Sequence, residues 1–410
     1  MDYSFDDQHR LIHFKYDLAP QVLAKLSRTL PELLMHDGLV TCSFEWRNHP
    51  ECEKLKTLAG EWARIHFAGD IINISCDKLI GSDFDLLATM TMARCRSERM
   101  PAAVKLMVWF FAFDNFVDEP AHMGADLQAS QEMMDAVMNV FHNVVAVEEV
   151  GIIKNGDKPE IVGPMKGGNS VYGSAIRVIR ESACDWWNEM RQLGMSMRQQ
   201  YRFVSVFKRY LDANTEQVAF RQLRHIPDLD TYKELRLHTS GCYVCSMMLE
   251  FALGLDLADE IIEHPLLVAL NVAAFSHVMF VNDIFSFRKE LSDGDLMNIV
   301  PILLWQNLGI SHQQIVALRD VEPLVRETIS QALALVRELD EECVRLMAKI
   351  QVAVRGGSEV GEGEVLAEEE AAAAVERYMD GVSDWMSGNV QWHHISKRYV
   401  QNNNNPSISI

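Results

Sequence analysis

The sequence predicts an all-α protein built as a single-domain helical bundle, and three observations support this prediction. The 410 residues contain only 12 Pro and 22 Gly, too few turn-forming residues for a fold of many short strands. Apolar residues recur with the helical period, whereas the alternation typical of strands is hard to find. No linker divides the helical run, so we expect one domain over residues 1–410, with its core between about 20 and 400.

Breaks in the helical periodicity set the boundaries of the predicted elements. We expect helices at residues 20–35, 53–67, 84–96, 101–118, 126–149, 173–194, 196–224, 230–254, 259–290, 296–307, 312–349 and 364–400. Residues 72–74 are rich in β-branched side chains but too few to carry a sheet. The glycine-rich stretches 151–173 and 355–363 predict surface loops, and the polar residues 401–410 predict a disordered tail.

Composition limits the class of protein. A content of 48% hydrophobic residues excludes a wholly disordered chain, and a mean hydropathy of −0.05 excludes a polytopic membrane protein. The apolar run 266–280 is interrupted by Asn271, Ser276 and His277, which favours a buried core helix over a membrane span. We therefore expect no stable insertion into a membrane.

The net charge of −20 bears on possible partners, because so acidic a surface repels nucleic acid and anionic lipid. We expect no nucleic-acid partner, and a polyanionic substrate would need metal ions to enter. The N-terminal residues are acidic and polar, unlike a secretory signal, so we expect a cytoplasmic protein with reduced thiols. Eight cysteines are scattered, and Cys242 and Cys245 lack the second ligand pair of a zinc site, so we expect packing cysteines.

The predicted helix 101–118 ends in a cluster of carboxylates. Asp114 and Asp118 are separated by four residues and so share a helix face, followed directly by Glu119. Their charges repel each other and sit at the helix C-terminus, where the helix dipole disfavours anions. A divalent cation would relieve both penalties, and hard oxygen ligands suit Mg²⁺. The alternative is an ordinary solvated, acidic helix end.

A second set of oxygen ligands follows the long apolar helix. Asn282, Ser286 and Glu290 are spaced four residues apart, so all three fall on one stripe of the helix. Side chains lean toward the N-terminus of a helix, which lets Glu290 reach back toward the other two. Lys289 lies beside them, where its charge could meet an anionic ligand. A polar, water-facing helix end is the alternative interpretation.

The segments DNFVDE at 114–119 and NDIFSFRKE at 282–290 resemble the two metal-binding motifs of class I terpene synthases, D(D/N)xx(x)D/E and NDxxSxxKE. The resemblance is strongest to microbial, and especially fungal, sesquiterpene cyclases. Asn115 replaces a second Asp found in many members, and it stays open whether Asp118 or Glu119 joins Asp114 as a metal ligand. Asp295 and Asn298 fit the usual continuation of the second motif.

Two further matches extend this resemblance. The family has an arginine 46 residues before the first ligand of the second motif, and Arg236 stands at that position. Arg398 and Tyr399 match a C-terminal Arg-Tyr pair. The resemblance implies that Arg236, Lys289, Arg398 and Tyr399 bind the diphosphate. It also implies a backbone carbonyl from one of residues 239–241, without deciding which.

The resemblance implies a class I isoprenoid synthase fold with a central active-site cavity. It implies three Mg²⁺ ions, with Mn²⁺ as a substitute, and a prenyl diphosphate substrate that ionises and cyclises. Farnesyl diphosphate is the expected substrate, with geranylgeranyl or geranyl diphosphate as alternatives. A chain-elongating prenyltransferase and a metal-free helical interaction protein are the rival hypotheses, and the chain could be a monomer or a homodimer.

Aromatic side chains are candidates for the lining of such a cavity, because their faces stabilise cations. Phe110 and Phe113 precede the first motif, and Trp392 precedes the Arg-Tyr pair. Phe110 shares the helix face of Asp114, whereas Phe113 is rotated from it by about 100°. We therefore expect all three to line the cavity, with Phe110 the more exposed of the two phenylalanines.

Overall fold

The computed structural model describes residues 14–15, 40–68, 76–118, 123–141, 172–308, 321–354, 369–396 and 398. Most of these residues are helical, which confirms the all-α prediction. The described strands are β1 (Phe14–Lys15) and β2 (His225–Ile226), which form a short antiparallel pair. The predicted helix 20–35, most of the two glycine-rich stretches, the tail, Glu119 and Tyr399 lie outside the described residues.

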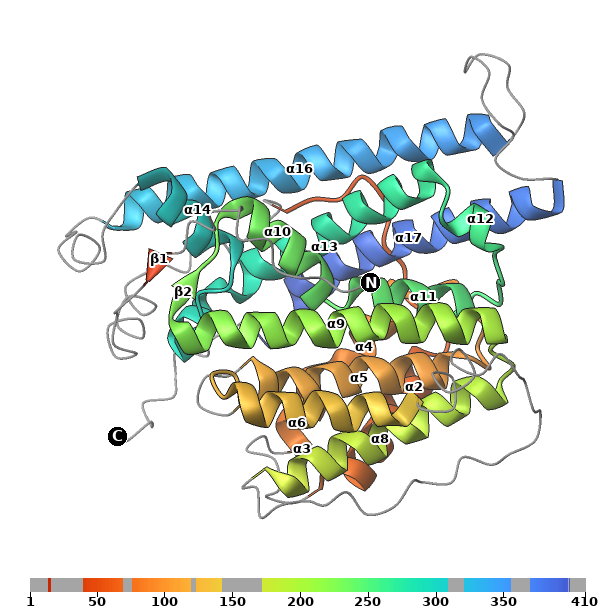
Figure 1. Cartoon of the computed structure of the whole chain (residues 1–410). Helices are drawn as coiled ribbons and strands as arrows, with labels where there is room; N and C mark the ends of the chain where they lie inside the picture. Colours follow the sequence, from red (N-terminus) through yellow and green to blue (C-terminus); the bar gives the residue numbers. More distant parts are fainter. Residues whose placement is uncertain are drawn as a thin grey trace.

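The helices in the first half of the chain form one side of the bundle (Figure 1). Its elements are α2 (Cys52–Phe67), α3 (Cys76–Gly81), α4 (Phe84–Thr91), α5 (Met100–Val117), α6 (Leu127–Met138), η1 (Asn139–Phe141), α8 (Gly173–Gln192) and α9 (Met197–Leu223). Helix α5 is apolar nearly all round and packs against α2, α4 and α8. Such a helix belongs in the centre of a bundle, where no face meets water.

The second half is arranged around α13 (Pro265–Asp293), the long apolar helix. The other elements are α10 (Leu229–Thr239), α11 (Cys242–Ala252), α12 (Asp259–Ile262), α14 (Ile299–Leu308), α16 (Val321–Val354) and α17 (Glu369–Ile395). Helix α13 packs between α16 and α17 and also contacts α10, α11 and α14. In Figure 1, α16 runs along one edge of the bundle and α9 crosses its middle. Buried apolar side chains from α2 through α17 form one continuous core.

Several predicted boundaries are wrong. The helix expected at 230–254 is two helices, separated at Ser240 and at Gly241, whose φ of +68° suits glycine. The helix expected at 259–290 is also divided, because Pro265 starts α13 and cannot donate a backbone hydrogen bond to continue α12. The helix expected at 84–96 ends at Thr91.

Among the described residues, two helices, α5 and α13, are long and apolar enough to span a membrane by composition. In this fold 78% of the apolar window in α5 and 61% of that in α13 are buried against other helices. Their apolar side chains therefore serve the protein core, as the interrupted run around Asn271 predicts.

Candidate active site

A cavity between α4, α5, α9, α10, α11, α13 and α17 brings together most of the predicted site residues. The predicted ligands and diphosphate-binding residues on its wall are Asp114, Asp118, Asn282, Ser286, Glu290, Arg236, Lys289 and Arg398. These residues come from both halves of the sequence. The cavity thus has an α5 wall, with the first carboxylate cluster, and an α13 wall, with the second set of oxygens.

Asp114 projects from the last turns of α5 into the cavity. Its Oδ1 accepts a hydrogen bond of 2.9 Å from the hydroxyl of Tyr210 on α9. Burial, reinforced by the charge of Asp118, raises the pKa of Asp114 to about 8. The charges of Arg398 and Arg236 lower this pKa, but by less than burial raises it. The carboxylate therefore has too little positive charge nearby to compensate for its burial.

Asp118 caps the C-terminus of α5 and has a basic neighbour that Asp114 lacks. Its Oδ1 accepts hydrogen bonds from Arg221 Nη2 at 3.1 Å and from Gln217 Nε2 at 3.3 Å. Arg221 also forms a two-pronged contact with Asp295, and it donates to the carbonyl of Val117 at 3.0 Å. Buried Arg221 thereby joins the end of α5 to the loop after α13.

The α13 wall holds its oxygen ligands within a network of donors. Asn282 Oδ1 accepts from Arg236 Nη2 at 2.9 Å, and Glu290 Oε2 accepts from Asn298 Nδ2 at 2.8 Å. The same Asn298 amide lies 3.5 Å from the Ser286 hydroxyl. Burial, with the charges of Asp283 and Asp295, raises the pKa of Glu290 to about 7. The predicted stripe on α13 is therefore aligned by its neighbours.

Asp283, next to the stripe, is buried and faces away from the cavity into a set of donors. Its carboxylate accepts from Arg236 Nε at 3.0 Å, from the backbone N–H of Ile299 at 3.0 Å and from the Tyr232 hydroxyl. Although burial opposes it, the charge of Asp283 raises the pKa of Arg236 well above its usual value. Asp283 thereby holds the Nε and Nη2 atoms of Arg236, and Nη2 also reaches Asn282.

The remaining basic residues also lie at the cavity. Lys289 Nζ bonds to Asp293 at 2.8 Å, one turn further along α13. The guanidinium of Arg398 lies 5.0 Å from the ring centres of Phe84 and Phe111, over their faces. Stacking of this kind holds an arginine in place over an aromatic face.

The three predicted aromatic residues differ in position. Phe110 and Trp392 line the cavity, and Trp392 is fixed by a 2.8 Å hydrogen bond from its Nε1 to the carbonyl of Asp83. Phe113 is fully buried, stacks on Trp109 with ring centres 5.0 Å apart, and is not part of the cavity wall. The expectation that Phe113 lines the cavity is wrong, because the rotation by one residue turns it into the core.

Some residues of this site were not found from the sequence. Tyr210, Gln217 and Arg221 lie on α9, far from both motifs along the chain. Gln217 and Arg221 are one turn apart. This spacing is common on exposed helix faces, so it does not indicate a functional site. Cys242 and Cys245 also line the cavity rather than only packing in the core.

The side chains fit a divalent metal. Asp114 and Glu290 face one cavity from opposite walls, and nearby acidic groups help raise the pKa of each. A cation supplies the positive charge that both carboxylates lack. The donors are carboxylate, amide and hydroxyl oxygens, which are the ligands of hard divalent ions.

Comparison with protein families gives a match that includes both walls. Residues 105–331, more than half of the chain, match the family model "Terpene synthase family 2, C-terminal metal binding". The chain belongs to this terpene synthase family. Its enzymes are lyases that act with a divalent metal.

Individual relatives agree with this assignment. Sesquiterpene synthase 3 of Postia placenta is 28% identical over 326 residues, which cover 79% of this chain and 72% of that protein. Alpha-muurolene synthase of Coprinopsis cinerea is 26% identical over 379 residues, covering 90% and 73%. Germacradien-4-ol synthase from Streptomyces citricolor has the same fold, with a TM-score of 0.65 at 19% identity over 87% of this chain and 98% of its own.

Proposed function

We propose that this terpene synthase is a Mg²⁺-dependent sesquiterpene cyclase whose substrate is farnesyl diphosphate. The observation that carries the proposal is the convergence of two sets of hard oxygen ligands and four Arg or Lys side chains on one cavity. The names of its fungal relatives support the sesquiterpene class.

The two walls would share the metal ions between them. Asp114, with Asp118 or Glu119, would hold two Mg²⁺, and the stripe Asn282, Ser286 and Glu290 would hold a third. When bound, the ions neutralise the diphosphate and stabilise the charge that develops on it as the C–O bond ionises. Asn282 is now bonded to Arg236 and Glu290 to Asn298, so both must exchange a protein donor for the ion.

The basic residues would bind the oxygens of the diphosphate. Arg236 contacts Asp283 through both Nε and Nη2, and its Nη2 also donates to Asn282. Release of Asn282 would free one N–H of Nη2 for an anion, while Nε and Nη2 still contact Asp283 and keep the side chain in place. Arg398, Lys289 and Tyr399 would complete the recognition of the leaving group.

The apolar part of the cavity would receive the isoprenoid chain. Phe110 and Trp392 line it together with Met107, Val278 and Met279. These side chains are largely apolar, and aromatic faces stabilise a carbocation by about 0.5–2 kcal/mol each. They also exclude water, so that the cation reacts with its own double bonds.

The test is incubation of the purified enzyme with Mg²⁺ and farnesyl, geranyl or geranylgeranyl diphosphate in parallel. Gas chromatography with mass detection identifies the hydrocarbons, and a phosphate assay counts released diphosphate. We expect cyclic fifteen-carbon products from farnesyl diphosphate and none after EDTA treatment. A cyclic twenty-carbon product as the main outcome would assign a diterpene cyclase, and chain-lengthened diphosphates would assign an elongating transferase.

A further inference from the structure

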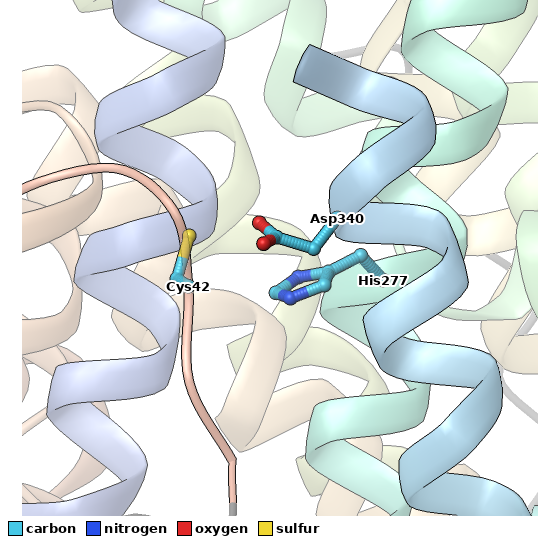
Figure 2. A group of neighbouring side chains, drawn as sticks. All are labelled: Cys42, His277 and Asp340. Carbon is cyan, nitrogen blue, oxygen red and sulfur yellow. The ribbon is translucent and has the colours of Figure 1, made fainter. Parts of the chain in front are cut away.

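A second group of ligand atoms lies outside the terpene synthase cavity. Cys42 belongs to the irregular segment before α2, His277 to α13 and Asp340 to α16. One ligand atom from each, the thiol sulfur, a ring nitrogen and a carboxylate oxygen, lie within 4.8 Å of one another. Figure 2 shows the three side chains pointing toward a common centre from three separate segments. None of them lines the cavity.

His277 gives an independent reason to suspect a ligand. It is fully buried, and neither of its ring nitrogens has a hydrogen-bond partner among the described residues. Buried polar atoms are rarely left without a partner, so such an exception calls for a missing ligand, ion or water. Burial also lowers the pKa of His277 to about 4, which keeps the ring in the neutral form that binds metals.

Asp340 is held in position by Ser43, the residue next to Cys42. The backbone N–H of Ser43 donates to Asp340 Oδ1 at 3.0 Å and to Oδ2 at 3.1 Å, and the Ser43 hydroxyl also donates to Oδ2. Hydrogen bonds of this kind orient the carboxylates of metal sites. The Cys42 thiol interacts with the same carboxylate and is partly exposed, which leaves a route for an ion to enter.

The donor set indicates which ion fits. Sulfur, nitrogen and oxygen together are typical of Zn²⁺, whereas the oxygen ligands of the cavity suit Mg²⁺. Zinc bonds of about 2.0–2.3 Å in a tetrahedron separate the ligand atoms by about 3.3–3.8 Å. The present spread, within 4.8 Å, requires each atom to move by less than about an ångström.

We propose that Cys42, His277 and Asp340 bind one Zn²⁺ ion that joins the N-terminal segment to α13 and α16. The ion takes the place of the thiol proton of Cys42, which leaves to the solvent, and it accepts a lone pair from the neutral ring of His277. Asn282 follows His277 by five residues, which is about 140° around the helix. The zinc site and the α13 wall therefore occupy different faces of one helix. The ion would fix α13 on the face that does not line the cavity.

The experiment measures metal content with Zn²⁺ and Co²⁺ as probes. The enzyme is stripped with EDTA, incubated with either ion in excess Mg²⁺ to occupy the oxygen ligands of the cavity, and separated from free metal. Elemental analysis counts retained zinc, and absorption spectra of the cobalt form report thiolate coordination. Cys42→Ser is compared with Cys52→Ser, a second partly buried cysteine, at the start of α2.

We expect about one zinc per chain and a thiolate-to-cobalt band in the wild type and in Cys52→Ser. Both signals should disappear in Cys42→Ser, and Asp340→Asn should lose most of the zinc. Zn²⁺ should raise the melting temperature of the wild type and leave that of Cys42→Ser unchanged, which checks that the variant folds. Wild-type enzyme without stoichiometric zinc, or Cys42→Ser with the same zinc and cobalt spectrum, would overturn the proposal.

Discussion

Two buried carboxylates, Asp283 of α13 and Asp114 of α5, are held differently. On the α13 side, Asp283 has an arginine, a tyrosine hydroxyl and a backbone N–H as partners, and Asn298 aligns Glu290. On the α5 side, Asp114 accepts a hydrogen bond from Tyr210, and its pKa is raised to about 8. A carboxylate that forms an ion pair with an arginine stabilises the fold. A buried carboxylate without enough positive charge nearby is suited to bind a metal cation.

The largest expected effect tests this contrast through stability. Asp283→Asn removes the charge that compensates Arg236 and should destabilise the protein by about 3 kcal/mol or more, because it leaves a buried charge without its partner. Asp114→Asn should instead stabilise the metal-free protein, because it removes a carboxylate that lacks compensation. Thermal and urea unfolding in EDTA measure both. Equal destabilisation by the two variants would contradict the contrast.

The pH dependence of the Asp114 variant sharpens the same comparison. The folded-state pKa of about 8 exceeds the unfolded value of about 3.9, so the folded protein binds this proton more tightly. Stability therefore falls as pH rises from about 4 through about 8. The gain in melting temperature from Asp114→Asn should amount to a few degrees at about pH 9 and nearly vanish at about pH 4. If the increase in melting temperature were the same at every pH, it would come from packing and not from the charge of Asp114.

Loss of a ligand on the α13 wall should reduce turnover strongly. Asn282→Ala or Glu290→Ala should lower kcat on the order of 10³-fold, equal to about 4 kcal/mol, if each holds a metal ion. Glu263→Ala, an exposed carboxylate outside the cavity wall, is the matched control. Diphosphate release at saturating Mg²⁺ is the measurement. Near-native rates in a folded Glu290→Ala variant would show that Glu290 does not bind the third metal ion.

The two carboxylates of the α5 wall should differ from each other. Asp114→Asn should reduce turnover by about 10²-fold, and Asp118→Asn by about 10-fold, because Asp118 is already paired with Arg221 and Gln217. Activity measured across a Mg²⁺ titration separates weaker metal binding from slower chemistry. If Asp118→Asn proved the more damaging change, Asp118 would be the principal ligand and Asp114 an accessory group.

Arg236 links the α13 wall to the diphosphate, and its geometry can be tested with a conservative change. Arg236→Lys keeps the positive charge beside Asp283 but cannot contact Asp283 and Asn282 at once. Turnover should fall by about 10-fold or more while the melting temperature changes little. Full activity in this variant would show that a point charge is enough.

The smallest effect on rate is expected from the aromatic residues of α5. Phe110→Leu removes a ring from the cavity wall and should shift products toward acyclic or monocyclic terpenes, with diphosphate release within about threefold of wild type. Phe113→Leu, the same change three residues later, should lower stability and leave the product profile unchanged, because its ring stacks on Trp109 in the core. Identical product shifts in both would indicate an indirect effect of packing.

Much of the site was predictable because its ligands are local in sequence. Asp114 and Asp118 share a face of α5, and Asn282, Ser286 and Glu290 share a stripe of α13, so helical geometry alone groups them. The same local rules failed at Gly241 and Pro265, where one residue divides a helix that the apolar period continues. Those breaks follow from backbone geometry, which the periodicity of side chains does not record.

The sequence by itself determined the helical class, the two groups of candidate ligands and the order of the motifs. Only the tertiary structure decided that Arg221 pairs Asp118 with Asp295, that Phe113 faces the core, and that Cys42 meets His277 and Asp340. These contacts join segments that are distant along the chain. Their formation depends on how α9, α13 and α16 pack, and helix packing is set by the shapes of many side chains together.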